Sequence, residues 1–410
     1  MAAFSYMDEK RDTGLFVSHA VYSDDDGATW QASKNDLVVD SGGKGSHSGA
    51  IEPVVVQLAD GRVWMVIRAQ SGYLFESYSS NDGETWSPPK RTHFRSSSAP
   101  AAVLRLRDGR LVLVWNNELH SRSSLVMAIQ ERGEWKGYRE ISPPFAPEDQ
   151  NVGARYPFVA ERSDRHILAG YGERGRVGRK QRHFAECTTY WNGNTRLFRV
   201  DPAWLLEAKA AEDFSQGLQH LQAQATRGVQ VLRDSNNAPA LRLQKVADGP
   251  SGVTWNFPLG KSGKLKIKFR VEAGFKGAYF DLSEYFLQPS DQQGGTFRWM
   301  IDADLKIKMK RGGHSGSISR TTRDPYAEET SDIGKIRTTL EAGKAQELAI
   351  KWDCETNLAK LAIEGVYGST LMGMEPARGI GYVRIGLIPN GTDSAGLWVM
   401  GLESQSHAKE

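Results

Sequence analysis

Short hydrophobic runs separated by polar turns recur along the whole chain. In the first half an apolar run covers residues 16–21, and hydrophobic and polar residues alternate over residues 166–171. A period of two residues is typical of a strand that buries one face. From Asp213 onward, short alternating segments follow at residues 228–232, 240–245, 264–271, 277–282, 296–301 and 305–310. These patterns predict an all-β protein whose second half forms a separate β-sandwich domain.

One helix is predicted between the two halves. Asp201 is a favourable N-cap residue, Pro202 suits the first helical position, and helix-forming residues follow as far as Glu212. We therefore expect a linker helix at residues 201–212, between a first domain at residues 1–200 and a second at residues 213–410.

One eight-residue pattern occurs twice in the first half. Residues 23–30 and 79–86 both read S-x-[DN]-x-G-x-T-W, and each copy follows an apolar run that ends in a Tyr-Ser pair. The Asp or Asn side chain can bond to the backbone of its own turn, and glycine supplies a positive φ. The pattern therefore predicts the same compact turn in both places, with the tryptophan packed beneath it.

A longer repeat surrounds these turns. Residues 106–111 echo residues 58–63 at an offset of 48 positions, and residues 131–135 look like a decayed third copy of the turn pattern. A further unit runs from Tyr156 to Trp191, in which residues 162–167 replace the Asp-Gly turn. We count about four units, the first of them incomplete. Repeats of this length indicate the blades of a β-propeller.

The two turn motifs resemble the Asp-box, or BNR, repeats of the sialidase-like β-propellers. The resemblance implies a six-bladed propeller, so four units imply that N-terminal blades are missing from this chain. The second half is more loosely similar to the laminin-G/concanavalin-like jelly rolls, through residues 346–353, 357–365 and 396–402. The expected fold is thus a partial propeller followed by a β-sandwich.

Composition limits the partners of this chain. Its 52 basic and 49 acidic residues leave a net charge of +3, which gives no reason to expect nucleic acid or an anionic membrane as a partner. The two cysteines, Cys187 and Cys354, indicate neither a disulfide framework nor a zinc site. We expect no cofactor and assign no metal-binding residue, and calcium binding in the second domain stays open. The first 14 residues lack the apolar core of a signal peptide. Localisation stays open, periplasmic or extracellular if N-terminal sequence is missing, and so does the oligomeric state.

The sialidase resemblance implies a particular set of catalytic groups. A retaining sialidase attacks a sugar that carries a carboxylate, so a neutral tyrosine replaces the usual carboxylate nucleophile. A glutamate takes the proton of that tyrosine, three arginines clamp the substrate carboxylate, and an aspartate protonates the leaving oxygen.

Four of these six groups have candidates in the chain. Glu52 opens one inner strand and matches the base, Arg68 ends the neighbouring strand and matches the second clamp, and Tyr156 opens the inner strand of the fourth unit and matches the nucleophile. Arg122 lies where the third clamp arginine belongs. The first clamp arginine and the acid have no candidate, so the chain as given is expected to be inactive.

Each candidate also has a structural interpretation. Charged residues at strand ends are common, exposed arginines are common, and a tyrosine at a strand start is usually packed into a core. His47 precedes Glu52 in a glycine-rich loop at the expected mouth of the propeller, where a histidine either contacts substrate or is merely solvated.

Three functions are compatible with these residues. The leading hypothesis is a sialidase-like, exo-acting glycoside hydrolase that removes a terminal acidic sugar from a glycan. A second is another acidic-glycan enzyme on the same propeller, a rhamnosidase or a lyase, that depends on His47 instead of Tyr156. The third is a non-catalytic carbohydrate-binding or adhesion protein, because fold alone does not determine activity.

Overall fold

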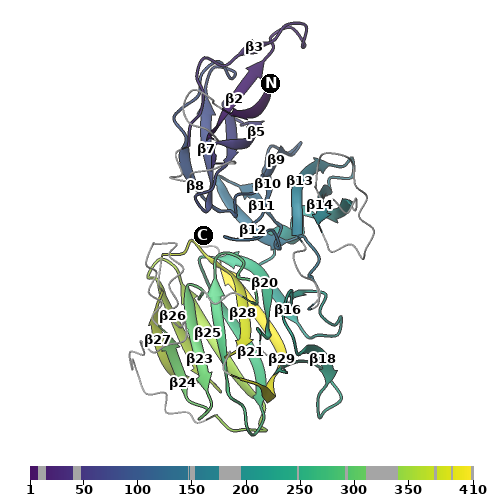
Figure 1. Cartoon of the computed structure of the whole chain (residues 1–410), viewed down its shortest axis with the longest axis vertical. Helices are drawn as coiled ribbons and strands as arrows, with labels where there is room; N and C mark the ends of the chain where they lie inside the picture. Colours follow the sequence, from purple (N-terminus) through teal and green to yellow (C-terminus); the bar gives the residue numbers. More distant parts are fainter. Residues whose placement is uncertain are drawn as a thin grey trace. The chain divides into compact units, whose positions relative to one another are not determined.

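The chain is built almost entirely from β-strands. The computed structural model describes residues 1–7, 15–39, 48–145, 147, 153–174, 195–246, 249–290, 294–310, 340–373, 376–388 and 391–407. Strands dominate these ranges (Figure 1), so the all-β prediction is confirmed. The chain divides into two compact units: residues 1–142 with 151–205, and residues 143–150 with 206–410. In the described part, no helix is both long and apolar enough to span a membrane.

The described residues of the first unit form four sheets that follow one another along the chain. The first contains β1 (Ala2–Met7), β2 (Leu15–Tyr22), β3 (Gln31–Ala32) and β4 (Ser48–Gly49); the second β5 (Ile51–Gln57), β6 (Val63–Arg68), β7 (Tyr73–Ser79) and β8 (Lys90–Arg95); the third β9 (Ala102–Arg105), β10 (Leu111–Trp115), β11 (Val126–Glu131) and β12 (Glu134–Glu140); the fourth β13 (Gly153–Glu161), β14 (Ile167–Arg174) and β15 (Thr195–Val200). The second, third and fourth are antiparallel meanders, as expected for blades.

The first strands of successive sheets lie next to one another. β1 contacts β5, β5 contacts β9, and β9 contacts β13. The second strands β6 and β10 are buried along their whole length because they carry apolar side chains on both faces. The strand β1 was not predicted, because it is short and four of its six residues are exposed. Its pairing with β2 holds it in place.

Both copies of the eight-residue motif form the predicted turn. The Oγ atoms of Ser23 and Ser79 accept the N–H groups of Gly27 and Gly83 at 2.8 and 2.9 Å. Asp25 Oδ1 accepts the Thr29 N–H at 2.8 Å, and hydrogen bonds from Thr29 and Ser23 lower the pKa of this carboxyl to about 2. The turn is therefore a local structure that its own side chains stabilise.

The two motif tryptophans differ in burial. Trp86 is 6% exposed and packs with Leu37 and Val39, as predicted. Trp30 is 53% exposed, and its Nε1–H donates to the Gly27 carbonyl of its own turn at 3.1 Å. The prediction of a packed tryptophan is thus right for the second copy and wrong for the first, because only the second meets side chains from another sheet.

A second turn recurs between the first two strands of three sheets. In the second and third sheets an Asp is followed by a glycine with positive φ, +88° at Gly61 and +91° at Gly109. Arg165 takes the glycine's place in the fourth sheet with a φ of +70°. All three residues donate their N–H to the carbonyl three residues earlier. The substituted Asp-Gly turn therefore keeps the same backbone at the cost of a strained arginine.

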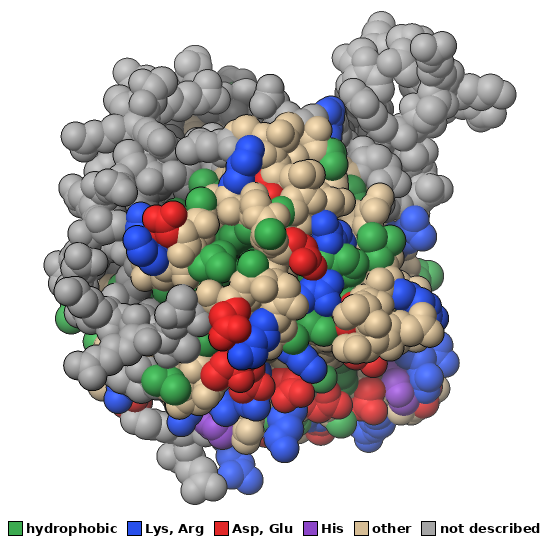
Figure 2. Space-filling model, turned by 90° about the horizontal axis from the view of Figure 1, so that it is seen from below, with side chains coloured by type: hydrophobic (Ala, Val, Ile, Leu, Met, Phe, Trp, Pro, Cys, Tyr) green, Lys and Arg blue, Asp and Glu red, His purple; other side chains and the backbone are tan. Residues whose placement is uncertain are grey.

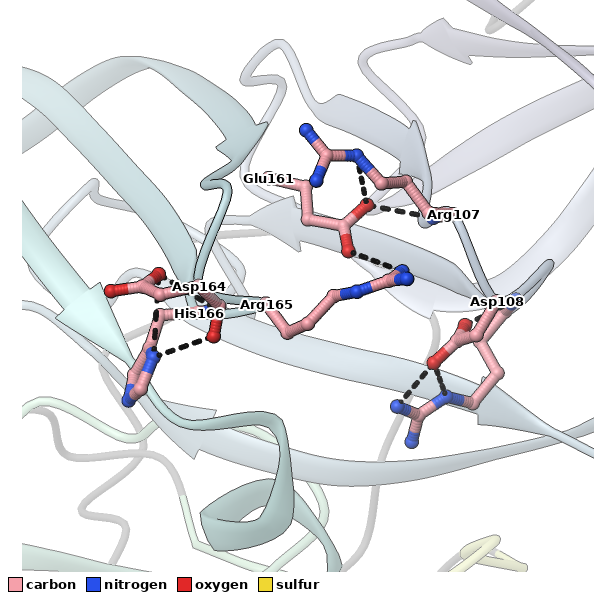
Figure 3. Close-up of polar contacts among 7 residues, drawn as sticks. Arg107, Asp108, Glu161, Asp164, Arg165 and His166 are labelled. Carbon is pink, nitrogen blue, oxygen red and sulfur yellow. Dashed lines mark hydrogen bonds and ion pairs between the residues drawn. The ribbon is translucent and has the colours of Figure 1, made fainter.

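Figure 3 shows the turn residues of the third and fourth sheets and the contacts around them. Glu161 accepts the backbone N–H of Arg107 at 2.7 Å and lies 3.4 Å from Nη1 of Arg165. Asp164 accepts the N–H of His166 at 3.2 Å. Glu161 thus joins two neighbouring sheets at the end of their strands.

The second unit is a sandwich of two sheets. One sheet orders β18 (Val229–Arg233), β19 (Pro239–Lys245), β29 (Asp393–His407), β21 (Ser262–Val271), β25 (Gln346–Asp353), β26 (Leu358–Ile363) and β27 (Val366–Met372), with β16 (Lys209–Glu212) beside β29. The other orders β17 (Leu221–Gln222), β20 (Gly252–Gly260), β28 (Ile380–Leu387), β22 (Gly277–Ser283), β23 (Phe297–Asp302) and β24 (Ile307–Lys310). Alternate residues of both sheets share one core, including Ile267 and Phe269 from β21 and Phe280 from β22.

The predicted linker helix is much shorter than expected. Asp201 caps the N–H of Ala203 at 2.9 Å, as predicted for an N-cap, but only Pro202–Leu206 is helical, as a 3₁₀ turn. Residues 209–212 instead pair with residues 402–405 of β29. Pairing with β29 overrides the helix propensity of these residues, because propensity is only a weak determinant of structure when a tertiary contact competes with it.

Acidic and basic side chains are interspersed over the surface seen in Figure 2, with hydrophobic side chains among them. This agrees with the nearly balanced net charge of +3. A surface of mixed sign has no overall attraction for polyanions, so any anion-binding region has to arise from a local arrangement of side chains.

Candidate active site

Glu52 and Tyr156 meet at the first strands of the second and fourth sheets. The Tyr156 hydroxyl donates to Glu52 Oε1 at 3.0 Å, although the two residues are 104 positions apart in the sequence. Tyr156 is 45% exposed, and the Glu52 side chain is 31% exposed. The phenol is therefore not a packed core residue, and both groups are accessible to a ligand.

Both residues have an unusual backbone conformation. Glu52 has a φ of +47° and Tyr156 a φ of +52°, and each lies where the pairing register shifts, as in a β-bulge. Each is followed by a proline, which has no N–H to continue the ladder. A positive φ at a non-glycine residue costs roughly 1–3 kcal/mol and is concentrated at functional sites. The matching bulges aim two side chains from different sheets at one point.

Arg68 lies beside Glu52 on the next strand. It is the last residue of β6 and pairs with Ile51, the residue before Glu52. Its Nη1 donates to Glu52 Oε2 at 2.7 Å, and it is only 8% exposed. Glu52 therefore accepts the phenol and the guanidinium on separate oxygens, so its carboxylate is already oriented toward Tyr156.

Arg122 completes the cluster from the loop after β10. Its guanidinium carbon lies 5.8 Å from the centroid of the Tyr156 ring, within the range of a cation–π contact. Burial lowers the pKa of Arg122 and the nearby charge of Arg68 lowers it further, while Tyr156 and Glu52 oppose the shift. The group remains a cation at neutral pH, because arginine is effectively always protonated in proteins.

Ser98 holds both arginines, and sequence reasoning missed it. Its Oγ accepts Arg68 Nε at 3.3 Å, and its carbonyl accepts Arg122 Nη2 at 3.0 Å. Ser98 also has a positive φ, +55°. It precedes the first strand of the third sheet, between the sheets that carry Glu52 and Tyr156. The only sequence signal is its place shortly before Pro100, in a repeat where Glu52 and Tyr156 also precede prolines.

The loop that carries Arg122 is tied down by buried polar groups. Asn116 Nδ2 donates to the carbonyls of Ser124 and Ala154 at 3.0 and 3.1 Å, and Glu118 accepts the Ser124 N–H at 2.8 Å. The Ala154 N–H donates to the Arg122 carbonyl at 2.7 Å. The loop is therefore bonded to β13 shortly before its tyrosine, which holds Arg122 and the phenol in register. Neither Asn116 nor Glu118 was predicted as a site residue.

One predicted site residue is not described. His47 lies outside the described residues, so its position relative to Glu52 is not part of this site. Within the described ranges, no group of three or more His, Cys, Asp or Glu side chains could hold a metal ion. The site built from described residues is thus one carboxylate, one phenol and two guanidinium groups.

Comparison with known proteins agrees with the repeat seen in the sequence. Residues 4–167 match the model of the BNR repeat-like domain family. This match covers the first three sheets and extends into the fourth. It does not extend to the second unit. The comparison with curated proteins gave no match.

Similar solved structures are sialidases and a trans-sialidase. A structure described as a sialidase is 16% identical, with 86% of this chain and 32% of that chain covered and a TM-score of 0.38. The Trypanosoma rangeli sialidase in complex with the inhibitor DANA is 11% identical, with 97% of this chain and 65% of that chain covered and a TM-score of 0.37. The intramolecular trans-sialidase from Ruminococcus gnavus is 22% identical, with 47% of this chain and 39% of that chain covered and a TM-score of 0.35. The chain spans about a third to two thirds of these proteins.

Proposed function

We propose that the chain is part of a sialidase-like glycoside hydrolase that acts on a glycan ending in a carboxylated sugar. The observation that carries this proposal is the contact of Tyr156 and Glu52 at 3.0 Å, with Arg68 2.7 Å from the other carboxylate oxygen. The BNR repeat-like match over residues 4–167 supports it. We also propose that the four sheets are propeller blades and that the second unit is laminin-G/concanavalin-like.

In the proposed reaction Tyr156 is the nucleophile and Glu52 its base. The phenol oxygen bonds to the anomeric carbon while its proton passes to Glu52 Oε1, and the bond from the sugar to the leaving group breaks. Water then attacks the same carbon, and the bond from that carbon to the phenol oxygen breaks. Glu52 returns its proton to this oxygen, and the proton lost by the attacking water passes to solvent. A neutral phenol approaches an anionic sugar without the repulsion that a carboxylate nucleophile would meet.

The arginines are proposed to bind the carboxylate of the sugar. Guanidinium groups form paired, charge-assisted hydrogen bonds with carboxylates. Arg68 bonds to Glu52, and Arg122 lies against the ring of Tyr156. No described residue is assigned as the acid that protonates the leaving oxygen. We therefore propose that this chain is inactive on natural glycosides, yet still reacts with a sugar whose leaving group needs no proton.

The test uses 2,3-difluorosialic acid, which forms a covalent intermediate with the Trypanosoma rangeli sialidase. Fluoride leaves without protonation, so only the nucleophile and its base are required. We expect intact-mass spectrometry to detect one adduct and peptide mapping to place it on Tyr156. Tyr156→Phe should abolish the adduct and Glu52→Gln should slow its formation by about a hundredfold or more. Tyr73→Phe is the matched control and should react like the unaltered chain.

Binding of the inhibitor DANA separates the remaining outcomes. An adduct on another residue, or one that persists in Tyr156→Phe, would overturn the assignment of the nucleophile. DANA binding that depends on Arg68 and Arg122 without any adduct would overturn catalysis and leave a carbohydrate-binding protein. Absence of both adduct and DANA binding would overturn the whole proposal.

A further inference from the structure

A row of lysines crosses the outer face of the larger sheet of the second unit. Lys264 on β21 is directly opposite Lys351 on β25, and Lys351 is directly opposite Lys360 on β26. On the other side, Lys264 is opposite Gln405 of β29, which in turn is opposite Lys209 of β16. The row therefore runs over five adjacent strands and carries four lysines and no acidic residue.

These lysines point away from the core. Their neighbours along the strands, such as Leu265, Ala359 and Leu361, belong to the buried core between the sheets. Lys209, Lys351 and Lys360 are exposed, and Lys264 is partly exposed. Within the described residues, none of the four lysines forms an ion pair or hydrogen bond through its side chain.

The arrangement is unfavourable for the folded protein by itself. Like charges directly opposite each other on neighbouring strands destabilise a sheet. The next row along the same face shows the usual compensation, because Lys266 pairs with Glu347 at 3.0 Å and lies opposite Glu403. The lysine row lacks such pairing. An anionic ligand that lies along the row would supply the missing countercharge.

The shape of the face determines which anion fits. Neighbouring strands are about 4.8 Å apart, so the four strand spacings from Lys209 to Lys360 span about 19 Å along the sheet face. A linear polymer with evenly repeated charges matches such a row. Trp398 on β29 of the same sheet is 9% exposed and covered by Arg242 and Arg270, so it offers no surface for base stacking. The row spans five strands, whereas the major groove of DNA admits an α-helix or a two-stranded ribbon, so this face does not enter a DNA groove.

We propose that the lysine row binds a linear acidic polysaccharide with a carboxylate or sulfate on its repeating sugars. The contacts are salt-dependent and come from Lys209, Lys264, Lys351 and Lys360. The proposal concerns the second unit and does not rest on the function proposed for Glu52 and Tyr156. The two proposals can therefore be tested and refuted independently of each other.

The test measures binding of the full chain to immobilised polygalacturonate and chondroitin sulfate, which separate carboxylate from sulfate. Neutral dextran, double-stranded DNA and phosphatidylserine vesicles are measured alongside. We expect binding to the acidic polysaccharides that weakens as salt is raised. Combining Lys264→Gln, Lys351→Gln and Lys360→Gln should weaken it about tenfold or more, because each lysine contributes to attraction near an anionic surface. The control variant, Lys276→Gln with Lys306→Gln and Lys344→Gln, loses the same charge elsewhere in the unit and should bind within about twofold of the unaltered chain.

Thermal unfolding distinguishes a binding defect from a folding defect. Removal of opposed like charges should leave the Tm of the row variant unchanged or raise it. Equal binding by the row variant and the unaltered chain would overturn the proposal. Tighter binding to DNA or to the vesicles than to either polysaccharide would also overturn it, in favour of a nucleic-acid or membrane contact.

Discussion

At the scale of single residues, the candidate site is marked by backbone conformation. Glu52, Ser98 and Tyr156 have φ values of +47°, +55° and +52°, and each lies at or just before the first strand of its sheet. A positive φ is unfavourable for a side chain with a Cβ, so three such residues converging on two arginines indicate strain that the surrounding structure maintains. We propose that Glu52 and Tyr156 supply the reactive groups, and Ser98 bonds to both arginines.

The role of Ser98 is testable with two substitutions. Ser98→Gly removes the hydroxyl that accepts Arg68 but tolerates the positive φ, whereas Ser98→Ala removes the hydroxyl and keeps the strain. We expect both to weaken DANA binding about three- to tenfold, in line with about 1 kcal/mol for one hydrogen bond. Ser98→Ala should also have the lower Tm of the two. Calorimetric titration and thermal unfolding measure these effects.

Ser97→Ala is the control for that experiment. The Ser97 hydroxyl is buried and has no hydrogen-bond partner in the described part of the chain. Its removal should leave DANA binding unchanged. If Ser98→Gly bound DANA as tightly as the unaltered chain, the side chain of Ser98 would have no part in positioning Arg68.

At the scale of elements, the repeated turns explain why the sheets resemble one another. Each turn is closed by hydrogen bonds within a few residues, such as Ser23 to Gly27 and Ser79 to Gly83. The turn between first and second strands keeps its backbone even where Arg165 replaces glycine. Local hydrogen bonds therefore determine the backbone of the turn. The residue with positive φ determines how much conformational free energy the turn costs.

The strain of a positive φ predicts that two substitutions in these turns change the free energy of unfolding in opposite directions. Arg165→Gly should stabilise the protein by about 1 kcal/mol, because glycine adopts the φ of +70° without strain. The lost contact between Arg165 and Glu161 is solvent-exposed on the arginine side and contributes little. Gly109→Ala should destabilise by a similar amount, since an added Cβ there meets no neighbour and only the φ of +91° opposes it. Urea midpoints measure both, and a lower midpoint for Arg165→Gly would mean that its ion pair outweighs the strain.

At the scale of the whole molecule, each compact unit is built from two separate stretches of the sequence. Residues 143–150 lie between β12 and β13 in the sequence but belong to the second unit. Phe145 is 4% exposed, and its N–H donates to Gln222 Oε1 at 2.8 Å. The sequence-based boundary at residue 200 therefore assigns this segment to a different unit from the one in which it packs.

Truncation of Phe145 should destabilise the second unit. We expect Phe145→Ala to cost about 3 kcal/mol, as for other buried phenylalanines. Hydrogen exchange should accelerate in β17 and β20, which pair beside Gln222. Phe94→Ala, at a residue 2% exposed in the first unit, is the matched control and should accelerate exchange around β8 and β10 instead. Faster exchange around β8 after Phe145→Ala would contradict the assignment of this segment.

The charge pattern is also a property of the whole molecule. A net charge of +3 predicts no attraction for polyanions, and the mixed charges on the face seen in Figure 2 agree. The lysine row is invisible in composition, because its members are separated by up to about 150 positions in the sequence. Only the pairing of five strands brings them into one line.

The sequence by itself determined the features that depend on neighbouring residues. The strand periodicity, both Asp-box turns, the substituted turn at Arg165 and the N-cap at Asp201 could all be predicted, because their hydrogen bonds close within a few positions. Tertiary structure decided the rest. It shortened the linker helix because β29 offered an edge to pair with. It also brought the phenol of Tyr156 to Glu52, 104 positions away, and placed Ser98 between the two arginines, because those contacts depend on how separate sheets pack against one another.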